Sequence, residues 1–264
     1  MPARRVAIDD PAAPALEPYT KVRERDLVGR ERLFVAEGEV VVRVLAERSR
    51  LRVRSLLIEE RRVDAIADVL ARLHDDVDAY VVPQRVMDAV VGFSIHRGIL
   101  ALGERGEEHD PRALVRDADV AVGLVGLTNH DNVGGIFRSA AAFAAGAVLL
   151  DDATCDPLYR KSIRVSAGAA LLVPFARARS AHELVDLVAD AGLTPIALTP
   201  RGEETITELP RGRYALLLGT EGPGLPADVL ARTRRVRIDM PGKLDSLNVA
   251  VAGAIALHAV TSRR

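Results

Sequence analysis

Short, almost entirely apolar segments alternate with helical patterns through the second half of the chain. The clearest apolar segments are residues 120–127 (VAVGLVGL) and 214–219 (YALLLG), and helical patterns occur at 133–145 and 181–192. Strands that are apolar along their whole length are buried on both faces, as in a parallel sheet covered by helices. We therefore predict an α/β fold with a mainly parallel sheet. The same patterns predict further strands at 147–152, 193–200 and 236–240, and helices around 160–170 and over 247–262.

The first half predicts a smaller α/β unit. Strands are expected at 52–60, 78–83 and 98–104, a helix at 63–76, and a helical stretch at the end of 31–48. Residues 103–119 interrupt this pattern with glycine, proline and a run of charged side chains, which indicates a domain boundary. The first 20 residues contain four prolines and no periodic pattern. We expect a mobile lead-in over 1–20, one α/β domain over 21–108 and a second over 115–264.

Composition excludes several classes of protein. The single Cys155 cannot form an intramolecular disulfide, and no Cys/His cluster has metal-ligand spacing, so we predict no metal site and a reducing compartment. The most apolar stretch, 247–260, is shorter than the roughly 18 residues of a membrane span and contains Asn248 and His258. The N-terminus carries Asp9 and Asp10 and no apolar signal core. These features predict a cytoplasmic protein without a membrane partner.

The net charge at first argues against a nucleic-acid partner, because 36 Lys+Arg face 37 Asp+Glu. All but three of those cations are arginine, which binds phosphate and guanine better than lysine does. GC-rich coding would also favour arginine over lysine, so the arginine bias does not show whether the protein binds nucleic acid. The absence of tryptophan disfavours a stacking platform for single strands. Local basic clusters remain candidates for RNA contact, at Arg43, Arg48, Arg50, Arg52, Arg54, Arg61 and Arg62, and at Arg160, Lys161 and Arg164.

The first segment that carries chemistry is GLTNHDNVGGIFRSAAAF (126–143). An apolar strand ends in a polar turn, and Asn132 is expected to cap the helix that follows. A capped strand–turn–helix does not explain Gly134 and Gly135, which lower the stability of a helix. Glycines in the first turn of a helix let another backbone or a phosphate approach closely. Arg138 lies off the apolar stripe of this helix, so it is either an ordinary exposed arginine or a functional one.

The second segment, YALLLGTEGPGLP (214–226), runs from an apolar strand into a glycine-rich loop with one carboxylate, Glu221. Such loops admit a nucleoside or phosphate where side chains would clash. The chain has neither a GxxxxGK[ST] motif nor a GxGxxG that opens a first βαβ unit. Because only one strand and one helix follow this loop, we expect the site to be built from the C-terminal end of the chain.

The third segment is RIDMPGKLDSLNVAVAGAIALH (237–258). Ser246 lies where the last helix is expected to begin, so a plain N-cap explains it as well as a functional role does. Asn248 is expected to face inward among apolar neighbours, where an amide needs hydrogen-bonding partners.

In this order the three segments resemble the SpoU (TrmH-type) branch of the SPOUT RNA methyltransferases. The family's first motif is matched by Asn129, Asn132, Gly134, Ile136 and Arg138, and its second by Gly219, Glu221 and Gly224. Its third is matched by Met240, Pro241, Ser246, Leu247, Asn248 and Val249, and residues 156–169 resemble its connecting segment. The chain departs from the family at His130–Asp131, where Pro–Gly is common, and at Ala250, where serine is frequent. None of these departing residues is assigned chemistry.

The resemblance implies a deep trefoil knot, a homodimer formed through the knotted domain, S-adenosyl-L-methionine as cofactor, and methyl transfer to a ribose 2′-hydroxyl of RNA. Residues 34–47 and 94–104 resemble an upstream ribosomal-protein-like RNA-binding domain, which favours rRNA over tRNA. The catalytic residues implied are Arg138, Glu221, Ser246 and Asn248, and the substrate residues are Asn129, Asn132 and Arg138. The cofactor residues implied are Thr199, Gly219, Glu221, Gly222, Ile238, Met240, Leu247 and Asn248.

Three alternatives stay open at this point. A tRNA 2′-O-methyltransferase would share the motifs, as would an antibiotic-resistance enzyme of the same architecture. A catalytically silent RNA-binding or ribosome-assembly protein would keep the fold, although the intact Arg138, Glu221, Ser246 and Asn248 disfavour it. A small-molecule or nucleotide-binding α/β enzyme is disfavoured by the missing phosphate-binding motifs.

Overall fold

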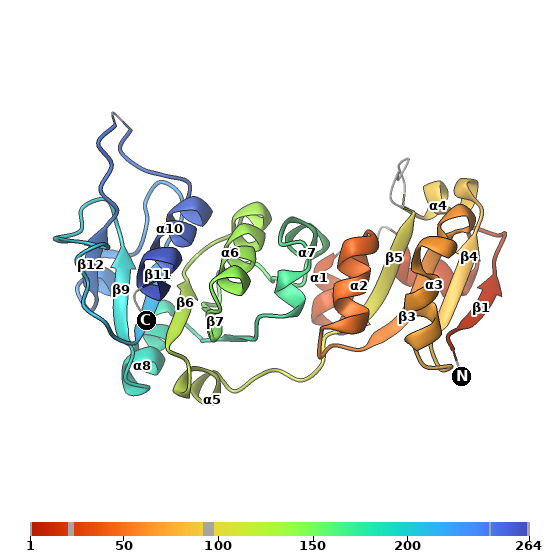
Figure 1. Cartoon of the computed structure of the whole chain (residues 1–264), viewed down its shortest axis with the longest axis horizontal. Helices are drawn as coiled ribbons and strands as arrows, with labels where there is room; N and C mark the ends of the chain where they lie inside the picture. Colours follow the sequence, from red (N-terminus) through yellow and green to blue (C-terminus); the bar gives the residue numbers. More distant parts are fainter. Residues whose placement is uncertain (1, 21–23, 92–97, 243, 263–264) are drawn as a thin grey trace. The chain divides into compact units, whose positions relative to one another are not determined.

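The computed structural model describes residues 2–20, 24–91, 98–242 and 244–262 (Figure 1). It consists of two compact units, Met1–Glu107 with Leu158–Leu172, and Glu108–Pro157 with Val173–Arg264. The division after Glu107 falls beside the boundary expected from the sequence, whereas the return of Leu158–Leu172 to the first unit was not expected. Residues 94–97 of the ribosomal-protein-like segment lie outside the described part of the chain.

The first unit contains a five-stranded sheet in the order β1-β4-β3-β5-β2. β1 and β3 pair parallel with β4, and β5 pairs antiparallel with β2 and β3. The strands are β1 (Arg4–Ala7), β2 (Leu33–Glu37), β3 (Val53–Glu59), β4 (Asp78–Val82) and β5 (Ile99–Glu104). The α-helices between them are α1 (Glu24–Gly29), α2 (Glu39–Glu47), α3 (Ala67–Arg72) and α4 (Gln84–Val91).

The prediction of a mobile lead-in over 1–20 is wrong. Arg4–Ala7 forms strand β1 at the sheet edge, and Pro14–Tyr19 forms a 3-10 helix whose Leu16 and Tyr19 are fully buried. The Tyr19 hydroxyl shares a 2.7 Å hydrogen bond with the Ser55 hydroxyl inside this unit. The segment shows no apolar pattern because an edge strand of sequence RRVA is exposed on most of its surface.

Helix α7 (Arg160–Val165) packs on β2 of the first unit. Arg160 Nε donates to the buried Glu37 carboxylate at 2.9 Å, and Arg164 Nη1 lies 3.6 Å from the same oxygen. Ser49 Oγ adds a 2.7 Å bond to the Leu171 carbonyl. These arginines, first considered for RNA contact, therefore balance a buried carboxylate.

The N-terminal arginine cluster is partly neutralised as well. Arg43 forms ion pairs with Glu39 and Asp68, which hold the guanidinium and raise its pKa. Arg52 pairs with Asp76. Arg48, Arg50 and Arg54 are exposed. Because Arg43 and Arg52 are paired with carboxylates, fewer arginines of this cluster can contact RNA than the sequence suggests.

The second unit contains a seven-stranded sheet in the order β10-β12-β9-β11-β6-β7-β8. Every pairing in it is parallel, which confirms the predicted parallel sheet. The strands are β6 (Val120–Leu124), β7 (Ala147–Leu150), β8 (Phe175–Arg177), β9 (Thr194–Leu198), β10 (Glu204–Thr205), β11 (Tyr214–Leu218) and β12 (Arg234–Arg237). β8 and β10 were not predicted, because three and two residues are too short to show a pattern.

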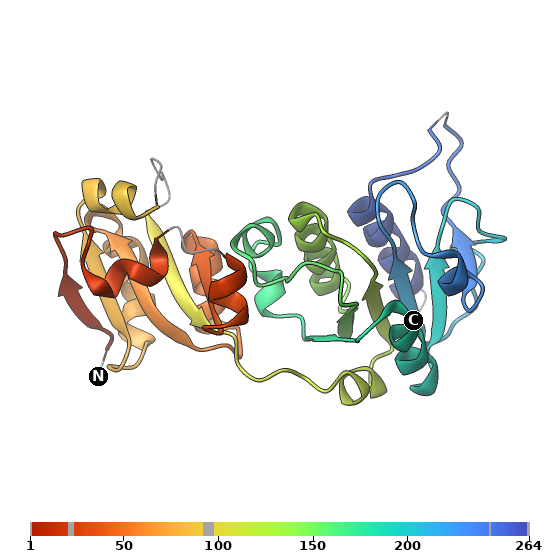
Figure 2. The same ribbon diagram turned by 180° about the vertical axis from the view of Figure 1, so that it is seen from behind.

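Helices cover both faces of this sheet (Figures 1 and 2). They are α5 (Pro111–Arg116), α6 (His130–Ala142), α8 (Ala181–Asp190), α9 (Ala227–Leu230) and α10 (Val249–Thr261). α5, α8 and α9 share one core with Ala215 and Leu217 of β11. On the opposite face α10 packs against α6 and β11, where Gly253 lies against Leu218. Among the described residues, no helix is both long and apolar enough to cross a bilayer.

Candidate functional site

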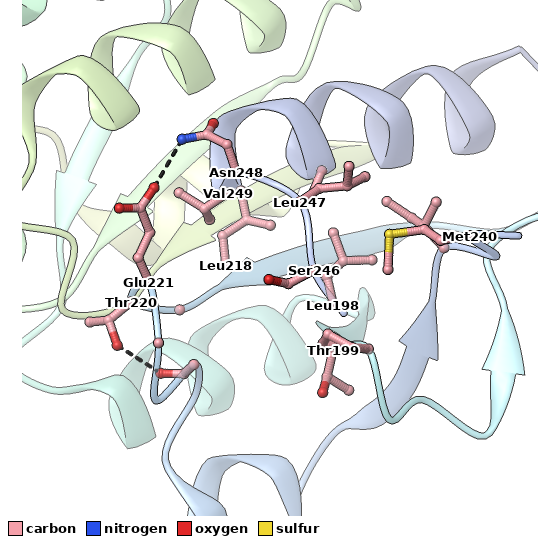
Figure 3. A pocket seen from close by; sticks show the side chains of 16 residues that line it. Leu198, Thr199, Leu218, Thr220, Glu221, Met240, Ser246, Leu247, Asn248 and Val249 are labelled. Carbon is pink, nitrogen blue, oxygen red and sulfur yellow. Dashed lines mark hydrogen bonds between the residues drawn. The ribbon is translucent and has the colours of Figure 1, made fainter. Parts of the chain in front are cut away.

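A cavity of about 360 Å³ lies where three neighbouring strands of the second unit end (Figure 3). β9, β11 and β12 end at Leu198, Leu218 and Arg237, and the residues that follow each strand form the walls with the first turn of α10. The carboxyl ends of parallel strands meet at one edge of the sheet, which is where ligands bind in open α/β folds. The fold therefore builds a ligand-sized cavity from the last third of the chain.

The cavity brings together most of the residues singled out from the sequence. All eight residues expected to hold a cofactor line it, and Ser246 lines it as well. These eight are Thr199, Gly219, Glu221, Gly222, Ile238, Met240, Leu247 and Asn248. Asn129, Asn132 and Arg138 are not among the lining residues. A single chain therefore brings the expected cofactor residues together around the cavity, and Arg138 lies outside the cavity lining.

The glycine loop after β11 folds back on itself. A Cβ atom on Gly219 would lie 2.5 Å from the backbone of Gly224 and Leu225, so no larger residue fits without moving the loop. The Gly224 N–H donates to the Thr220 carbonyl at 3.1 Å, and Thr220 Oγ1 donates to the Gly224 carbonyl at 3.2 Å. Gly222 and Gly224 have φ values of 90° and 74°, which glycine adopts without strain. The loop is therefore a compact turn that leaves room above it.

Three polar side chains from distant parts of the chain meet beside this loop. Asn132 Nδ2 and Asn248 Nδ2 donate to Glu221 Oε1 at 3.0 and 2.9 Å, and Asn248 Nδ2 lies 2.9 Å from Asn132 Oδ1. Asn132 is 3% exposed. We call Asn132, Glu221 and Asn248 the amide–carboxylate triad. The triad contains one residue from each of the three motif segments. The sequence alone does not show that these residues are in contact.

The predicted cap of α6 is wrong, and α10 is capped by a residue other than Ser246. The N-cap of α6 is Asn129, whose Oδ1 accepts from the Asp131 N–H at 2.9 Å, because the helix begins at His130 and not at Val133. Asn132 is thereby left to join the triad. The N-cap of α10 is Asn248, whose Oδ1 accepts from Ala250 N and Val251 N at 2.9 and 3.3 Å.

Asn248 is also exposed and not buried as expected, although its amide has partners on both sides. Because the helix begins two residues later than predicted, Ser246 does not cap it. Ser246 is exposed and lines the cavity, so the plain N-cap explanation for this residue is excluded.

Gly135 of α6 serves helix packing. A Cβ on Gly135 would lie 3.0 Å from the Ala250 Cβ, so α6 and α10 approach closely at this point. Arg138 follows one turn later and is exposed. The close approach explains the helix-destabilising glycine without a bound phosphate.

A buried carboxylate that was not singled out in the sequence holds the turn before α6. Asp151, directly after β7, accepts hydrogen bonds from the Gly126 N–H at 3.0 Å, and from Thr154 N and Oγ1 at 2.8 and 2.6 Å. Gly126 has a φ of 69°, and a Cβ there would lie 2.9 Å from Thr220 Cγ2. Asp151 therefore positions the turn that carries Asn129 and abuts the glycine loop. Two carboxylates directly after an apolar strand, Asp151 and Asp152, were the signal available in the sequence.

Cysteine and metal chemistry find no support among the described residues. Burial, with a smaller effect of Asp156, raises the pKa of the Cys155 thiol to about 11, so the nucleophilic thiolate is scarce at neutral pH. No group of three His, Cys, Asp or Glu side chains in the described part of the chain is arranged to hold a metal ion.

Comparisons with known proteins agree with this geometry. Residues 119–258 match the SpoU rRNA Methylase family. An uncharacterized tRNA/rRNA methyltransferase of Mycobacterium bovis is 38% identical over 260 residues, which cover 94% of this chain and 89% of that protein.

Solved structures show the same fold over nearly the whole chain. An RNA 2′-O ribose methyltransferase superposes with a TM-score of 0.80 at 28% identity, covering 98% of this chain and 99% of that one. The AdoMet-bound rRNA methyltransferase of Sinorhizobium meliloti superposes with a TM-score of 0.80 at 22% identity, covering 98% of each. At that identity the second likeness concerns the fold alone.

Proposed function

The chain belongs to the SpoU methylase family, and from this premise we propose that it transfers a methyl group from S-adenosylmethionine to a ribose 2′-hydroxyl of RNA. The observation that carries the proposal is the cavity at the ends of β9, β11 and β12, which all eight expected cofactor residues line. The similar RNA 2′-O ribose methyltransferase supports the ribose hydroxyl as acceptor. Methyl transfer follows from membership of the family, whereas the ribose 2′-hydroxyl as acceptor is proposed for this chain.

The residues of the cavity fit S-adenosylmethionine. A Cβ on Gly222 of the glycine loop would meet nothing within 4 Å, so the loop leaves space beside it. Leu198, Ile238 and Leu247 offer apolar surface for an adenosine. Main-chain groups at Gly219, Ile238 and Leu247 hold the adenosine and methionine parts. When bound, the cofactor supplies an electrophilic methyl group on a sulfonium.

Replacing Gly219 by alanine is expected to weaken S-adenosylmethionine binding at least about tenfold, because the loop must open to relieve a 2.5 Å contact with its own backbone. Calorimetric titration with S-adenosylmethionine measures the change. The matched control is Gly242→Ala, since a Cβ there meets nothing within 4 Å. Equal affinities in the two variants would contradict the assigned role of the loop.

The proposed reaction is an in-line displacement that needs positioning and removal of one proton. The ribose oxygen forms a bond to the methyl carbon, the carbon–sulfur bond breaks with its electron pair returning to sulfur, and the hydroxyl proton leaves to a base or to water. Arg138 orients the ribose or its phosphate and stabilises the developing charge, since a guanidinium is a poor base. The amide–carboxylate triad and Ser246 order the site, and Asn129 and Asn132 shape the substrate side.

We propose a homodimer because α10 and the residue Leu247 just before it expose an apolar stripe in the described part of the chain. Leu247, Val251 and Ile255 recur at four-residue intervals and are 37%, 49% and 38% exposed, and the nearby Leu244 is 77% exposed. A helix that is apolar on every side is normally buried. A second copy on this stripe would bring further groups, including its Arg138 on the adjacent α6, close to a cavity whose described lining contains no cation in one chain.

We propose a trefoil knot for the second unit, with the end of the chain passing through an earlier loop. β12 comes late in the sequence yet lies between β9 and β10. The turn after β9 packs directly on it, since the Thr199 N–H donates to the Val236 carbonyl at 2.9 Å and a Cβ on Gly202 would lie 2.3 Å from the Val236 backbone.

The favoured substrate is rRNA, with tRNA as the alternative, because the first unit resembles a ribosomal-protein module. The test is to map 2′-O-methylation in rRNA and tRNA from a strain that lacks this chain. We expect one rRNA position to lose its methyl group and to regain it when the gene is restored. A loss confined to tRNA would reassign the substrate, and unchanged methylation of both RNAs would contradict the proposed function.

A further inference from the structure

The described lining of the cavity contains one carboxylate, that of Glu221. Sixteen described residues line it, and among them only Glu221 has an ionisable acidic or basic side chain. The remaining walls are apolar side chains, glycines, hydroxyls and one amide, as the labelled side chains in Figure 3 show. The described lining residues therefore present one negative charge among otherwise uncharged side chains.

The triad fixes the position of that charge without cancelling it. Glu221 Oε1 accepts from the side-chain amides of Asn132 and Asn248 at 3.0 and 2.9 Å, and both donors are neutral. Asn248 is itself held as the N-cap of α10, and Asn132 is buried in the first turn of α6. Hydrogen bonds of this kind orient a carboxylate and preserve its charge.

The two charged residues beside the lining residue Ile238, at the end of β12, offset one another. Arg237 and Asp239 flank the lining residue Ile238, and Arg237 Nε donates to Asp239 Oδ1 at 2.9 Å. Glu221 is exposed, so water screens part of its charge, and a bound ligand that displaces this water is screened less from the carboxylate. Such a cavity favours a cationic ligand over a neutral one of the same shape.

We propose that Glu221 makes the cavity discriminate between S-adenosylmethionine and S-adenosylhomocysteine by the charge on sulfur. The inference rests on the proposed function and adds a specificity to it. Methyl transfer converts a sulfonium cation into a neutral thioether and changes the rest of the molecule little. The carboxylate therefore raises the affinity for the methyl donor relative to that for the product, and the product dissociates more readily after transfer.

Calorimetric titration of the full chain with each of the two compounds tests this role. In Glu221→Gln, which keeps an oxygen for the two amide donors, the preference for S-adenosylmethionine over S-adenosylhomocysteine is expected to fall about tenfold, or about 1.4 kcal/mol. The matched control is Asp245→Asn. This variant removes an exposed charge next to the lining residue Ser246, and Asp245 itself is outside the lining. Its preference is expected to equal that of the wild type.

A second measurement needs no substitution. Sinefungin carries an amino group, protonated at neutral pH, in place of the sulfonium methyl, so the unaltered protein is expected to bind it more tightly than S-adenosylhomocysteine. Equal weakening of both ligands in Glu221→Gln, or equal affinity of the wild type for sinefungin and S-adenosylhomocysteine, would overturn the inference while leaving the proposed function intact. A wild-type chain that binds none of the three compounds would overturn both.

Discussion

Arg138→Ala is expected to reduce methyl transfer at least about a hundredfold while changing the affinity for S-adenosylmethionine less than about twofold. The large loss follows because removing one preorganised donor to a developing charge typically costs two to three orders of magnitude in rate. The small change in affinity follows because Arg138 is exposed and does not line the cavity. Single-turnover methylation of RNA and calorimetric titration with the cofactor measure the two effects separately.

Two further variants make this result specific. Arg138→Lys keeps the charge and loses the planar pair of donors, so an intermediate rate is expected. Arg211→Ala removes an exposed arginine that is not part of the cavity lining, and its rate is expected to match the wild type. Retained activity in Arg138→Ala would refute the catalytic role of Arg138. A loss of S-adenosylmethionine affinity as large as the loss of rate would show instead that Arg138 acts in cofactor binding.

Ile255→Asp is expected to dissociate the proposed dimer, raising the dimer dissociation constant at least about a hundredfold, and to abolish methyl transfer with it. Ile255 lies in the exposed stripe of α10, and an unpaired carboxylate costs several kcal/mol when it is buried in an apolar interface. The side chain is partly exposed in the single chain, so α10 is expected to keep its packing on α6. Analytical ultracentrifugation over a concentration series measures the association.

The control for this variant is Val40→Asp, which places the same charge on an exposed valine of the first unit, 66% accessible and outside the stripe. It is expected to remain dimeric and active. A monomeric wild type, or an Ile255→Asp variant that stays dimeric, would contradict the interface on α10.

The parallel sheet and the position of the cavity were predictable because their causes are local in the sequence. Val120–Leu124 and Tyr214–Leu218 are apolar along their whole length, so their burial on both faces follows from the residue pattern alone. The loop at Gly219–Gly224 follows directly from one of these strands. β12 also leads into the third motif segment, and Thr199, directly after β9, is among the cofactor residues that the resemblance implies.

What the sequence did not reveal depends on contacts between distant residues. Whether Asn129 or Asn132 caps α6 depends on where the chain enters the helix, and both types of cap look alike in sequence. The polar strand Arg4–Ala7 pairs with β4 through its backbone, which leaves no side-chain pattern. Asp151 supports Gly126 across 25 residues. The triad likewise forms only when the first turn of α6, the glycine loop and the start of α10 meet.

Transfer of a labelled methyl group from S-adenosylmethionine to purified rRNA and tRNA tests the central claim most directly. A 2′-O-methyl group blocks alkaline cleavage, because the free 2′-hydroxyl is the nucleophile in that cleavage. We predict that the wild-type chain transfers label to RNA and that after alkaline hydrolysis the label remains in dinucleotides. Label in mononucleotides would place the methyl group on a base, and no transfer to either RNA by a chain that binds the cofactor would contradict the account.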